Sequence, residues 1–370
     1  MKVKVCILSM QQIDNMGSLL QSYALKKTIE KLGNEVEFID ITKRDEDFEL
    51  LGNYKQEYHE EREKDGLIGK ISKTDRYTLN RLKIKRKNIQ QGAVFNKFRV
   101  EQLNIEKKSH QYDVCVIGSD EVFNCLNSGA WGFSSQLFGN VPEANKVITY
   151  AASCGSTKYD ELPVKVAEKI RKTFKNVTAF SVRDENTHKF VAKLTDKQIS
   201  DNLDPVLIYN FIHEVEQTSL PEMPEHYCVI YSYYNRIHTA EEIDAIKGFC
   251  KKHQLTPVAI GAPQFWIKDY IVCSPFQCLK IFKRSDFVVT DTFHGTIFAS
   301  KYANKFAVLA RASNKNKLLN LVEMIGMKDQ LMSNIMEIEE KYSFLKGKER
   351  FSSIIEEEKK KTVQYLKSNI

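Results

Sequence analysis

Short apolar runs that end in polar residues alternate along the chain with amphipathic segments. Residues 2–8 form the first apolar run, and residues 9–17 form a polar loop. The next segment carries apolar side chains at residues 19, 20, 24, 25, 29 and 32, which is close to a helical period and predicts a helix that ends at Gly33. Residues 35–41 then alternate as a strand. This order predicts a βαβ unit that opens a doubly wound parallel sheet.

The same alternation continues in two further groups of elements. The first group has strand patterns at residues 112–117, 146–156 and 178–184, and a helix at about 163–175 that begins after a proline. A linker-like stretch at 209–226 contains two prolines and has no clear period. The second group has strand patterns at 228–234, 257–261 and 286–290 and helix patterns at 239–253 and 276–284.

These groups predict an α/β protein with two doubly wound Rossmann-like domains at residues 1–207 and 208–330, followed by a charged helical tail at 331–370. The length of 370 residues also exceeds what one hydrophobic core usually serves. Two such domains with a cleft between them suit a small anionic substrate and a larger acceptor held from opposite sides. The architecture alone does not identify the reaction.

Residues 43–110 interrupt the first group with a segment rich in Lys, Arg, Glu and Asp, and basic clusters occur at residues 81–87 and 97–99. The plain interpretation is a set of solvated helices inserted into the first domain. The alternative is a basic surface with interspersed aromatic residues, which makes peripheral contact with anionic lipid or binds a lipid-linked substrate. The sequence does not decide between the two.

Charge and cysteine content limit the class of protein. The net charge of +7 is compatible with anionic substrates or a membrane surface and is too small to indicate nucleic acid. The eight cysteines form no Cys-x-x-Cys pair, so we expect buried free thiols in a reducing compartment. No signal-peptide pattern and no run of about 18 apolar residues occurs. We therefore expect a cytoplasmic protein, with the inner membrane surface as the alternative location.

A polar turn at residues 290–296 separates an apolar run from an amphipathic segment. Ligands bind at such a turn in an open α/β sheet, because it leaves the carboxyl edge of a strand and the next helix offers N–H groups to an anion. His294 in this turn is therefore the first candidate for chemistry. We expect Gly295 to allow close approach of the backbone, and the N–H groups of Thr296 and Ile297 to complete an anion hole.

Five motifs stand in a defined order along the chain. They are NMGSLLQSYAL at residues 15–25, GSDEVFN at 118–124, SVRD at 181–184, LDP at 203–205 and DTFHGTIF at 291–298. In order and approximate spacing they resemble the polysaccharide pyruvyl transferase family, and the resemblance runs from about residue 3 to 330. It implies a fold similar to the two-domain GT-B glycosyltransferases. It also implies that phosphoenolpyruvate donates pyruvate, as a cyclic ketal across two hydroxyls, to a glycan or lipid-linked saccharide with loss of phosphate.

The resemblance also implies residues for the donor site. Arg183 matches an arginine proposed for donor binding, and its guanidinium can fork onto a carboxylate or a phosphate. His294 is expected beside the donor phosphate, where it donates a hydrogen bond, protonates the enol carbon or assists phosphate departure. Lys315 and Lys317 resemble the basic residue that the family places against the phosphate, and spacing favours Lys317. The expected donor site is Arg183, His294, Gly295, Thr296, Lys315 and Lys317.

A base must take protons from two sugar hydroxyls, so nearby carboxylates are the next candidates. Asp120 and Glu121 are expected to share catalysis with His294, and capping a helix is the alternative role for both. Departures from the family pattern at Met16, at residues 121–123 and at Thr292 lie near the expected acceptor cleft. Further candidates on the acceptor side are Asp14, Asn15, Gln21 and Asp291.

Two other classes of function stay open. One is a nucleotide-sugar glycosyltransferase of the same two-domain shape, in which the pocket at His294 holds a diphosphate. The other is a non-catalytic glycan-binding or scaffold protein. No metal is expected, because Asp291 and His294 are too few for a ligand set, and no cofactor is expected besides phosphoenolpyruvate as co-substrate. The expected partners are that donor and a saccharide or lipid-linked saccharide.

Overall fold

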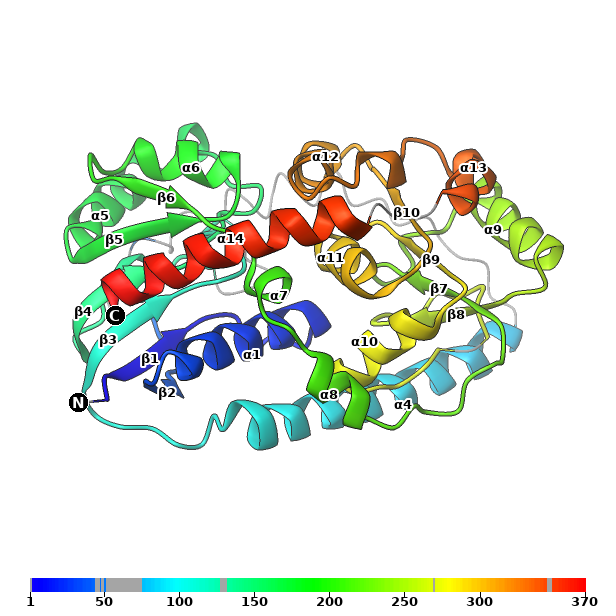
Figure 1. The fold of residues 1–370 in the computed structure, drawn as a ribbon, viewed down its shortest axis with the longest axis horizontal. Helices are drawn as coiled ribbons and strands as arrows, with labels where there is room; N and C mark the ends of the chain where they lie inside the picture. The colour runs from blue at the N-terminus through cyan, green and yellow to red at the C-terminus, as the bar shows by residue number, and fades with distance from the viewer. Residues whose placement is uncertain are drawn as a thin grey trace.

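The computed structural model describes residues 2–43, 47, 50, 75–126, 132–268, 270–344 and 348–370, with the backbone alone at 75–83 and 348. The strands form two sheets, one of six strands and one of five, which lie side by side in Figure 1. The strand pairs of both sheets are parallel. The predicted α/β class with two doubly wound sheets is therefore confirmed.

The first sheet consists of β1 (Lys4–Leu8), β2 (Glu35–Phe38), β3 (Tyr112–Ile117), β4 (Ala144–Thr149), β5 (Val177–Val182) and β6 (Ile199–Asp201). Its order is β2-β1-β3-β4-β5-β6. In register, Val5 of β1 lies opposite Val36 on one side and Val114 on the other. The central strands read as continuous apolar runs because helices cover both faces of such a sheet. The short edge strand β6 was not predicted, since three residues show no period.

Helix α1 (Met16–Lys31) begins at the cap that the sequence provides. The side chain of Asn15 accepts hydrogen bonds from the N–H groups of Gly17 and Ser18. The helix ends before Gly33, whose φ of 94° lies in the left-handed region that favours glycine. Helices α5 (Val164–Phe174) and α6 (Glu185–Ala192) follow β4 and β5.

The second sheet consists of β7 (Tyr227–Tyr231), β8 (Thr256–Ile260), β9 (Phe287–Thr290), β10 (Phe306–Leu309) and β11 (Leu331–Met332) in the order β11-β10-β9-β7-β8. Helices α9 (Ala240–Lys252), α10 (Pro275–Arg284), α11 (Phe293–Tyr302) and α12 (Lys315–Met324) connect the strands in sequence. Thr239 and Ser274 form capping boxes at the starts of α9 and α10, so the local sequence fixes both helix starts.

The linker between the two sheets contains short helices. These are α7 (Pro205–Ile208) and α8 (Ile212–Gln217). The linker-like stretch expected at 209–226 thus contains the short helix α8, whose six residues are too few to show an apolar period.

The C-terminal residues form α13 (Ile338–Ser343) and the long helix α14 (Lys348–Asn369). In Figure 1, α14 crosses α7 and returns to the first sheet. There the hydroxyl of Tyr365 donates a hydrogen bond to the carbonyl of Thr149 at 2.8 Å. The tail therefore packs against the half of the molecule where the chain begins.

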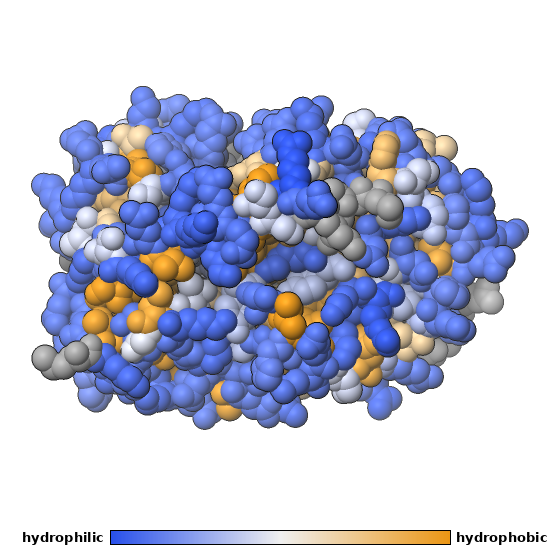
Figure 2. All heavy atoms as spheres, in the orientation of Figure 1, coloured by the Kyte–Doolittle hydropathy of each residue, from blue (hydrophilic) through white to orange (hydrophobic). Residues whose placement is uncertain are grey.

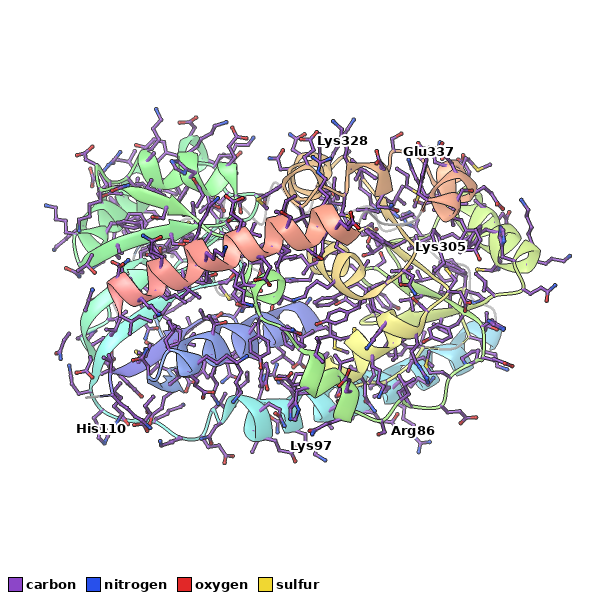
Figure 3. All side chains as sticks on the ribbon, viewed as in Figure 1. Arg86, Lys97, His110, Lys305, Lys328 and Glu337 are labelled. Atoms are coloured by element: carbon purple, nitrogen blue, oxygen red, sulfur yellow. The ribbon has the colours of Figure 1, made fainter. Side chains whose placement is uncertain are left out.

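Part of the charged segment 43–110 lies outside the described residues. The described part forms α4 (Asp75–Phe98), which continues into a π-helical segment at Arg99–Leu103. Helix α4 runs along the lower edge of the molecule in Figure 1, and Arg86 and Lys97 extend outward from it in Figure 3. The prediction of helices in this segment holds for this part of it.

Helix α4 does not belong to the first half alone. Lys87 Nζ donates to the carbonyl of Tyr270 at 2.6 Å, and Gln91 Nε2 donates to the carbonyl of Cys273 at 2.9 Å. Both acceptors lie in the second half, between β8 and α10. The described part of the charged segment therefore ties the two halves together, although it is inserted within the sequence of the first.

One cluster of buried hydrophobic residues runs through both halves. The ring of Tyr23 in α1 lies 5.0 Å from that of Phe276 in α10, measured between ring centroids. The hydroxyl of Tyr23 donates to Glu214 of α8 at 2.8 Å. This contact joins α1 of the first half to α10 of the second.

The cysteines and the molecular surface do not identify a class of function. All eight cysteines are buried and free, as predicted. The face drawn in Figure 2 is largely hydrophilic, and its hydrophobic residues form small separate groups. Within the described ranges, no helix combines the length and the apolar character needed to cross a bilayer.

Candidate functional site

A cavity of about 340 Å³, called here the interdomain cavity, lies between the two halves of the molecule. Its walls come from segments that follow the carboxyl ends of β1, β3 and β5 in the first sheet and of β7, β9 and β10 in the second. A parallel sheet brings such segments to one edge, and here two edges face each other. The lining residues are Met10, Ile13, Asn15, Ser18, Asp120, Glu121, Asn124, Arg183, Tyr233, Phe293, His294 and Lys317.

His294 is the second residue of α11 and lies in the cavity wall. The hydroxyl of Thr292 caps this helix by accepting a hydrogen bond from the N–H of Gly295 at 3.0 Å. Nε2 of His294 lies 3.6 Å from Oδ2 of Asp204, which belongs to the first half. The imidazole thus projects from the second half toward a carboxylate of the first.

Gly17, in the first turn of α1, makes room for the His294 ring. A Cβ atom built on Gly17 would lie 2.1 Å from Nδ1 of His294, far inside van der Waals contact. The starts of α1 and α11 therefore meet, and no larger residue fits unless the imidazole moves. The sequence contains Gly17 within a motif but predicts no role for it, because the contact is with a residue far along the chain.

Arg183 joins two carboxylates at the wall of the cavity. Its Nη1 donates to Asp204 at 2.7 Å, and its Nη2 donates to Asp120 at 3.3 Å. Burial raises the pKa of Asp204, but the nearby imidazole of His294 and the charge of Arg183 outweigh it and lower this pKa to about 2. Burial opposes the charged form of Arg183, whereas the charges of Asp120 and Asp204 raise its pKa. The guanidinium therefore reaches the cavity with its charge shared between two carboxylates.

Asp120 is fixed from a second side by α1. The hydroxyl of Ser18 donates to Oδ2 of Asp120 at 2.7 Å, while Oδ1 faces Arg183. The backbone of Asp120 has a φ of 72°, a left-handed conformation that aspartate adopts more readily than most residues. No helix begins within residues 118–126, so Asp120 and Glu121 do not take the alternative role of helix caps.

Lys317 of α12 reaches from the second half to Glu121 of the first. Its Nζ donates to Oε1 of Glu121 at 2.8 Å, and Asn124 donates to Oε2 at 2.7 Å. The charge of Lys317 lowers the pKa of Glu121 to about 2 against the effect of burial, with help from the hydrogen bonds of Lys317 and Asn124. A carboxylate with so low a pKa is a weak base while this ion pair holds.

The structure separates the expected donor residues into two groups. Arg183, His294 and Lys317 line the interdomain cavity. Lys315, on the same helix as Lys317, is exposed and outside the lining. The spacing argument that favoured Lys317 over Lys315 therefore agrees with the geometry.

Gly295 and Thr296 lie behind the cavity rather than in its wall. A Cβ atom on Gly295 would lie 2.1 Å from Oγ1 of Thr290, so the glycine lets α11 pack closely on β9. Thr296 is fully buried, and its N–H donates to the carbonyl of Thr292 at 3.0 Å. The N–H of Thr296 therefore does not form part of the expected anion hole, because it is hydrogen-bonded within the helix.

The acceptor-side predictions also divide. Asn15 lines the interdomain cavity, and together with Asp14 it lines an adjoining cavity of about 40 Å³. Asp14 also accepts a hydrogen bond from Arg99 at 2.6 Å. Gln21 is fully buried and donates to the hydroxyl of Ser9 at 2.7 Å, so its expected contact with an acceptor is corrected.

The expected place of Asp291 on the acceptor side is the prediction that the structure corrects most clearly. Its side chain has no exposed surface, and Arg311 donates to it at 2.5 Å. Arg236 lies 3.6 Å from the same oxygen, and the hydroxyl of Ser232 donates to the other at 2.7 Å. Asp291 therefore holds the loops around β9 together and does not face an acceptor.

Several residues at the cavity were not singled out from the sequence. Ser18 and Asn124 stand inside two of the motifs, and Asp204 stands inside a third. Tyr233 stands at the end of the strand predicted at 228–234, and that position was a usable signal, since ligands gather at the carboxyl ends of parallel strands. Phe293, whose ring lies 4.6 Å from the guanidinium of Arg183, stands inside the motif at 291–298, and its place beside His294 was a signal of the same kind.

Comparison with protein families finds that the profile described as polysaccharide pyruvyl transferase matches residues 15–313. The solved UDP-N-acetylglucosamine 2-epimerase from Rickettsia bellii is similar with a TM-score of 0.50 and 11% identity, covering 100% of this chain and 98% of that one. The UDP-GlcNAc 2-epimerase from Neisseria meningitidis, bound to UDP-GlcNAc, gives a TM-score of 0.50 and 9% identity over 100% of both chains. No curated protein sequence matches. These similarities confirm the predicted GT-B architecture and carry no substrate with them.

Proposed function

The chain belongs to the polysaccharide pyruvyl transferase family, and from that premise we propose that it moves pyruvate from phosphoenolpyruvate onto two hydroxyls of a sugar. The product is a cyclic ketal in a cell-surface or capsular polysaccharide or in its lipid-linked precursor. The observation that supports this most is the convergence of His294, Arg183 and Lys317 from two domains on one cavity of about 340 Å³. That volume suits a small ligand held between two walls.

The charges in the interdomain cavity set a condition on donor binding. Phosphoenolpyruvate carries nearly three negative charges, so it needs cations with free hydrogen-bonding capacity. Lys317 is held by Glu121, and Arg183 is shared by Asp120 and Asp204. We infer that the donor phosphate takes Lys317 from Glu121. The exchange removes the main cause of the low pKa of Glu121 and leaves a stronger base beside the acceptor.

The chemistry follows from these positions. His294 protonates the methylene carbon of phosphoenolpyruvate, which becomes a methyl group and leaves a cationic C2. One sugar hydroxyl forms a bond to C2 and gives its proton to Glu121 or Asp120. The bond from C2 to the phosphate oxygen then breaks, the phosphate leaves with a proton, and the second hydroxyl closes the ring and loses its own proton. The protons taken from the two hydroxyls replace those delivered to carbon and phosphate, so no external acid is consumed.

Phosphate release from phosphoenolpyruvate tests the proposal. The protein is incubated with the donor and with free or lipid-linked derivatives of galactose, mannose, glucose and N-acetylmannosamine. We expect release with at least one acceptor, and a product heavier than that acceptor by one pyruvate less one water. Release without such a product would indicate hydrolysis and contradict ketal formation. Absence of release with every acceptor would contradict the proposed function.

A further inference from the structure

A second cavity of about 570 Å³, called here the α4 cavity, opens between α4 and the segment that follows β8. On one side it is lined by residues of α4, including Arg86 and Lys87. On the other it is lined by Phe265, Trp266 and Lys268. Hydrogen bonds from α4 to the backbone of residues 270 and 273 hold the two walls together.

The α4 cavity is connected to the interdomain cavity by one fixed piece of backbone. Gln264 donates from its side chain to the carbonyl of Tyr233 at 2.8 Å, and the N–H of Phe265 donates to the side chain of Asn235 at 2.9 Å. Tyr233 lines the interdomain cavity, and Phe265 lines the α4 cavity. The small cavity of about 40 Å³ is lined by Tyr233, which it shares with the interdomain cavity, and by Gly261, which lies shortly before Pro263 in the wall of the α4 cavity.

Aromatic surface is exposed along this connection. Tyr233 is 53% exposed, Tyr234 is 58% exposed and Phe265 is 39% exposed. Trp266 is half-buried, and its indole N–H donates to the carbonyl of Ile237 at 3.0 Å, which fixes the plane of its ring. Exposed aromatic rings held in place by the backbone offer flat apolar faces, and the C–H faces of pyranose rings pack against such surfaces.

The charged residues of the α4 cavity define the sign of its ligand. Arg86, Lys87 and Lys268 are all cations, and the lining includes no carboxylate among the residues that the structure describes. Lys87 is engaged with the carbonyl of Tyr270, which leaves Arg86 and Lys268 exposed to solvent. Aromatic faces beside exposed cations match sugar rings that carry negative substituents.

We propose that the α4 cavity binds an acidic saccharide, the part of the acceptor glycan that lies beyond the sugar at which reaction occurs. Sugar faces stack on Phe265 and Trp266, and carboxylate or phosphate substituents meet Arg86 and Lys268. The assignment rests on the proposed function for its role in the reaction. Binding at a distance from the reacting centre raises the effective concentration of the acceptor hydroxyls in the interdomain cavity.

The two tryptophans of the chain, Trp131 and Trp266, provide a readout that does not depend on catalysis. In a Trp131→Phe background, Trp266 is the sole source of indole fluorescence. The emission is titrated with tetragalacturonate, tetraglucuronate and tetramannuronate, and with the neutral methyl ester of each, in the absence of phosphoenolpyruvate. We expect a saturable change with at least one uronate and binding at least roughly fivefold weaker for its methyl ester.

Two variants locate the binding. Phe265→Ala is expected to weaken uronate binding roughly tenfold through loss of the stacking face. Arg86→Glu is expected to weaken it roughly fivefold, whereas Lys97→Glu makes the same charge change on the same helix, outside the cavity lining, and is expected to leave it within twofold. Circular dichroism and melting temperature check that each variant is folded.

The outcomes separate this inference from the proposed function. No change of Trp266 emission with any uronate, equal binding of uronate and methyl ester, or equal losses from Arg86→Glu and Lys97→Glu would each overturn the assignment. Uronate binding without phosphate release from phosphoenolpyruvate would keep the assignment and remove the proposed function. Phosphate release with monosaccharide acceptors, without a change of Trp266 emission on addition of any uronate, would keep the proposed function and remove the assignment.

Discussion

The turns after β3 and β9 have the same kind of sequence, an apolar strand followed by a short polar turn with an aspartate, yet the two aspartates differ in whether they face the interdomain cavity. Asp120, after β3, lies in the wall of the interdomain cavity. Asp291, after β9, is fully buried. The cause is the neighbouring loops, because Arg236 after β7 and Arg311 after β10 both reach Asp291. An aspartate at a strand end can therefore take part in the site only where the cations that pair with it leave its carboxylate facing the cavity.

The same comparison shows how the two edges divide the site. The second sheet encloses its aspartate and presents His294 and Lys317 to the cavity. The first sheet presents Asp120 and Glu121, and it provides the space at Gly17 that the imidazole occupies. The second half therefore supplies the imidazole and a lysine, and the first half supplies the carboxylates. Substitutions on the two edges should lower activity for different reasons.

The largest expected effect is on the imidazole. His294→Ala should lower the rate of phosphate release from phosphoenolpyruvate by roughly 10²- to 10⁴-fold, the usual contribution of a general acid, with the fold retained as judged by circular dichroism. His188→Ala, on an exposed histidine of α6, is the matched control and should leave the rate unchanged. Full activity of His294→Ala would remove this residue from the site.

The two aspartates should separate stability from activity. Asp291→Ala leaves Arg311 and Arg236 without their shared carboxylate, and we expect it to lower the free energy of unfolding by about 3 kcal/mol in urea. Asp120→Asn keeps an acceptor for Ser18 and should cost about 1 kcal/mol while lowering the rate of phosphate release. Equal losses of stability in the two variants would break the contrast between the two turns.

Gly17 tests the fit between the two halves. Gly17→Ala places a methyl group where the His294 ring lies, so the imidazole must shift, and a shift of about 1 Å lowers a rate by up to roughly 10²-fold. Gly248→Ala is the control, because a Cβ atom there has no neighbour within 4 Å and alanine favours the helix. Unchanged phosphate release in Gly17→Ala would show that the position of the ring does not matter.

Acid sensitivity of the fold is a further expected effect, confined to low pH. Because the pKa of Asp204 is lowered from 3.8 to about 2, its contribution to stability is complete above its unfolded pKa and is lost as the pH falls from about 4 toward 2. This contribution is roughly 2 kcal/mol. Asp204→Asn should therefore show a shallower loss of unfolding free energy over that pH range. Parallel pH profiles for the variant and the wild type would contradict the assignment.

Sequence patterns were sufficient where a local rule decides the structure. The period of α1 and the apolar strands gave the two sheets, and the polar turn at residues 290–296 put His294 at a strand end. They were insufficient where a contact joins distant segments. Nothing local tells that Arg311 closes over Asp291, that Gly17 meets His294, or that α4 ties the two halves together. Those contacts depend on tertiary packing, which overrides the pattern of any one segment.

Melting temperature in the presence of candidate donors tests the central claim most directly, since only a ligand that binds the folded state raises it. Millimolar phosphoenolpyruvate should stabilise the wild type and the Lys315→Ala variant, and should stabilise Lys317→Ala much less, because Lys317 lines the cavity and Lys315 does not. Stabilisation by UDP- or GDP-sugars but not by phosphoenolpyruvate would contradict the account and indicate a nucleotide-sugar enzyme.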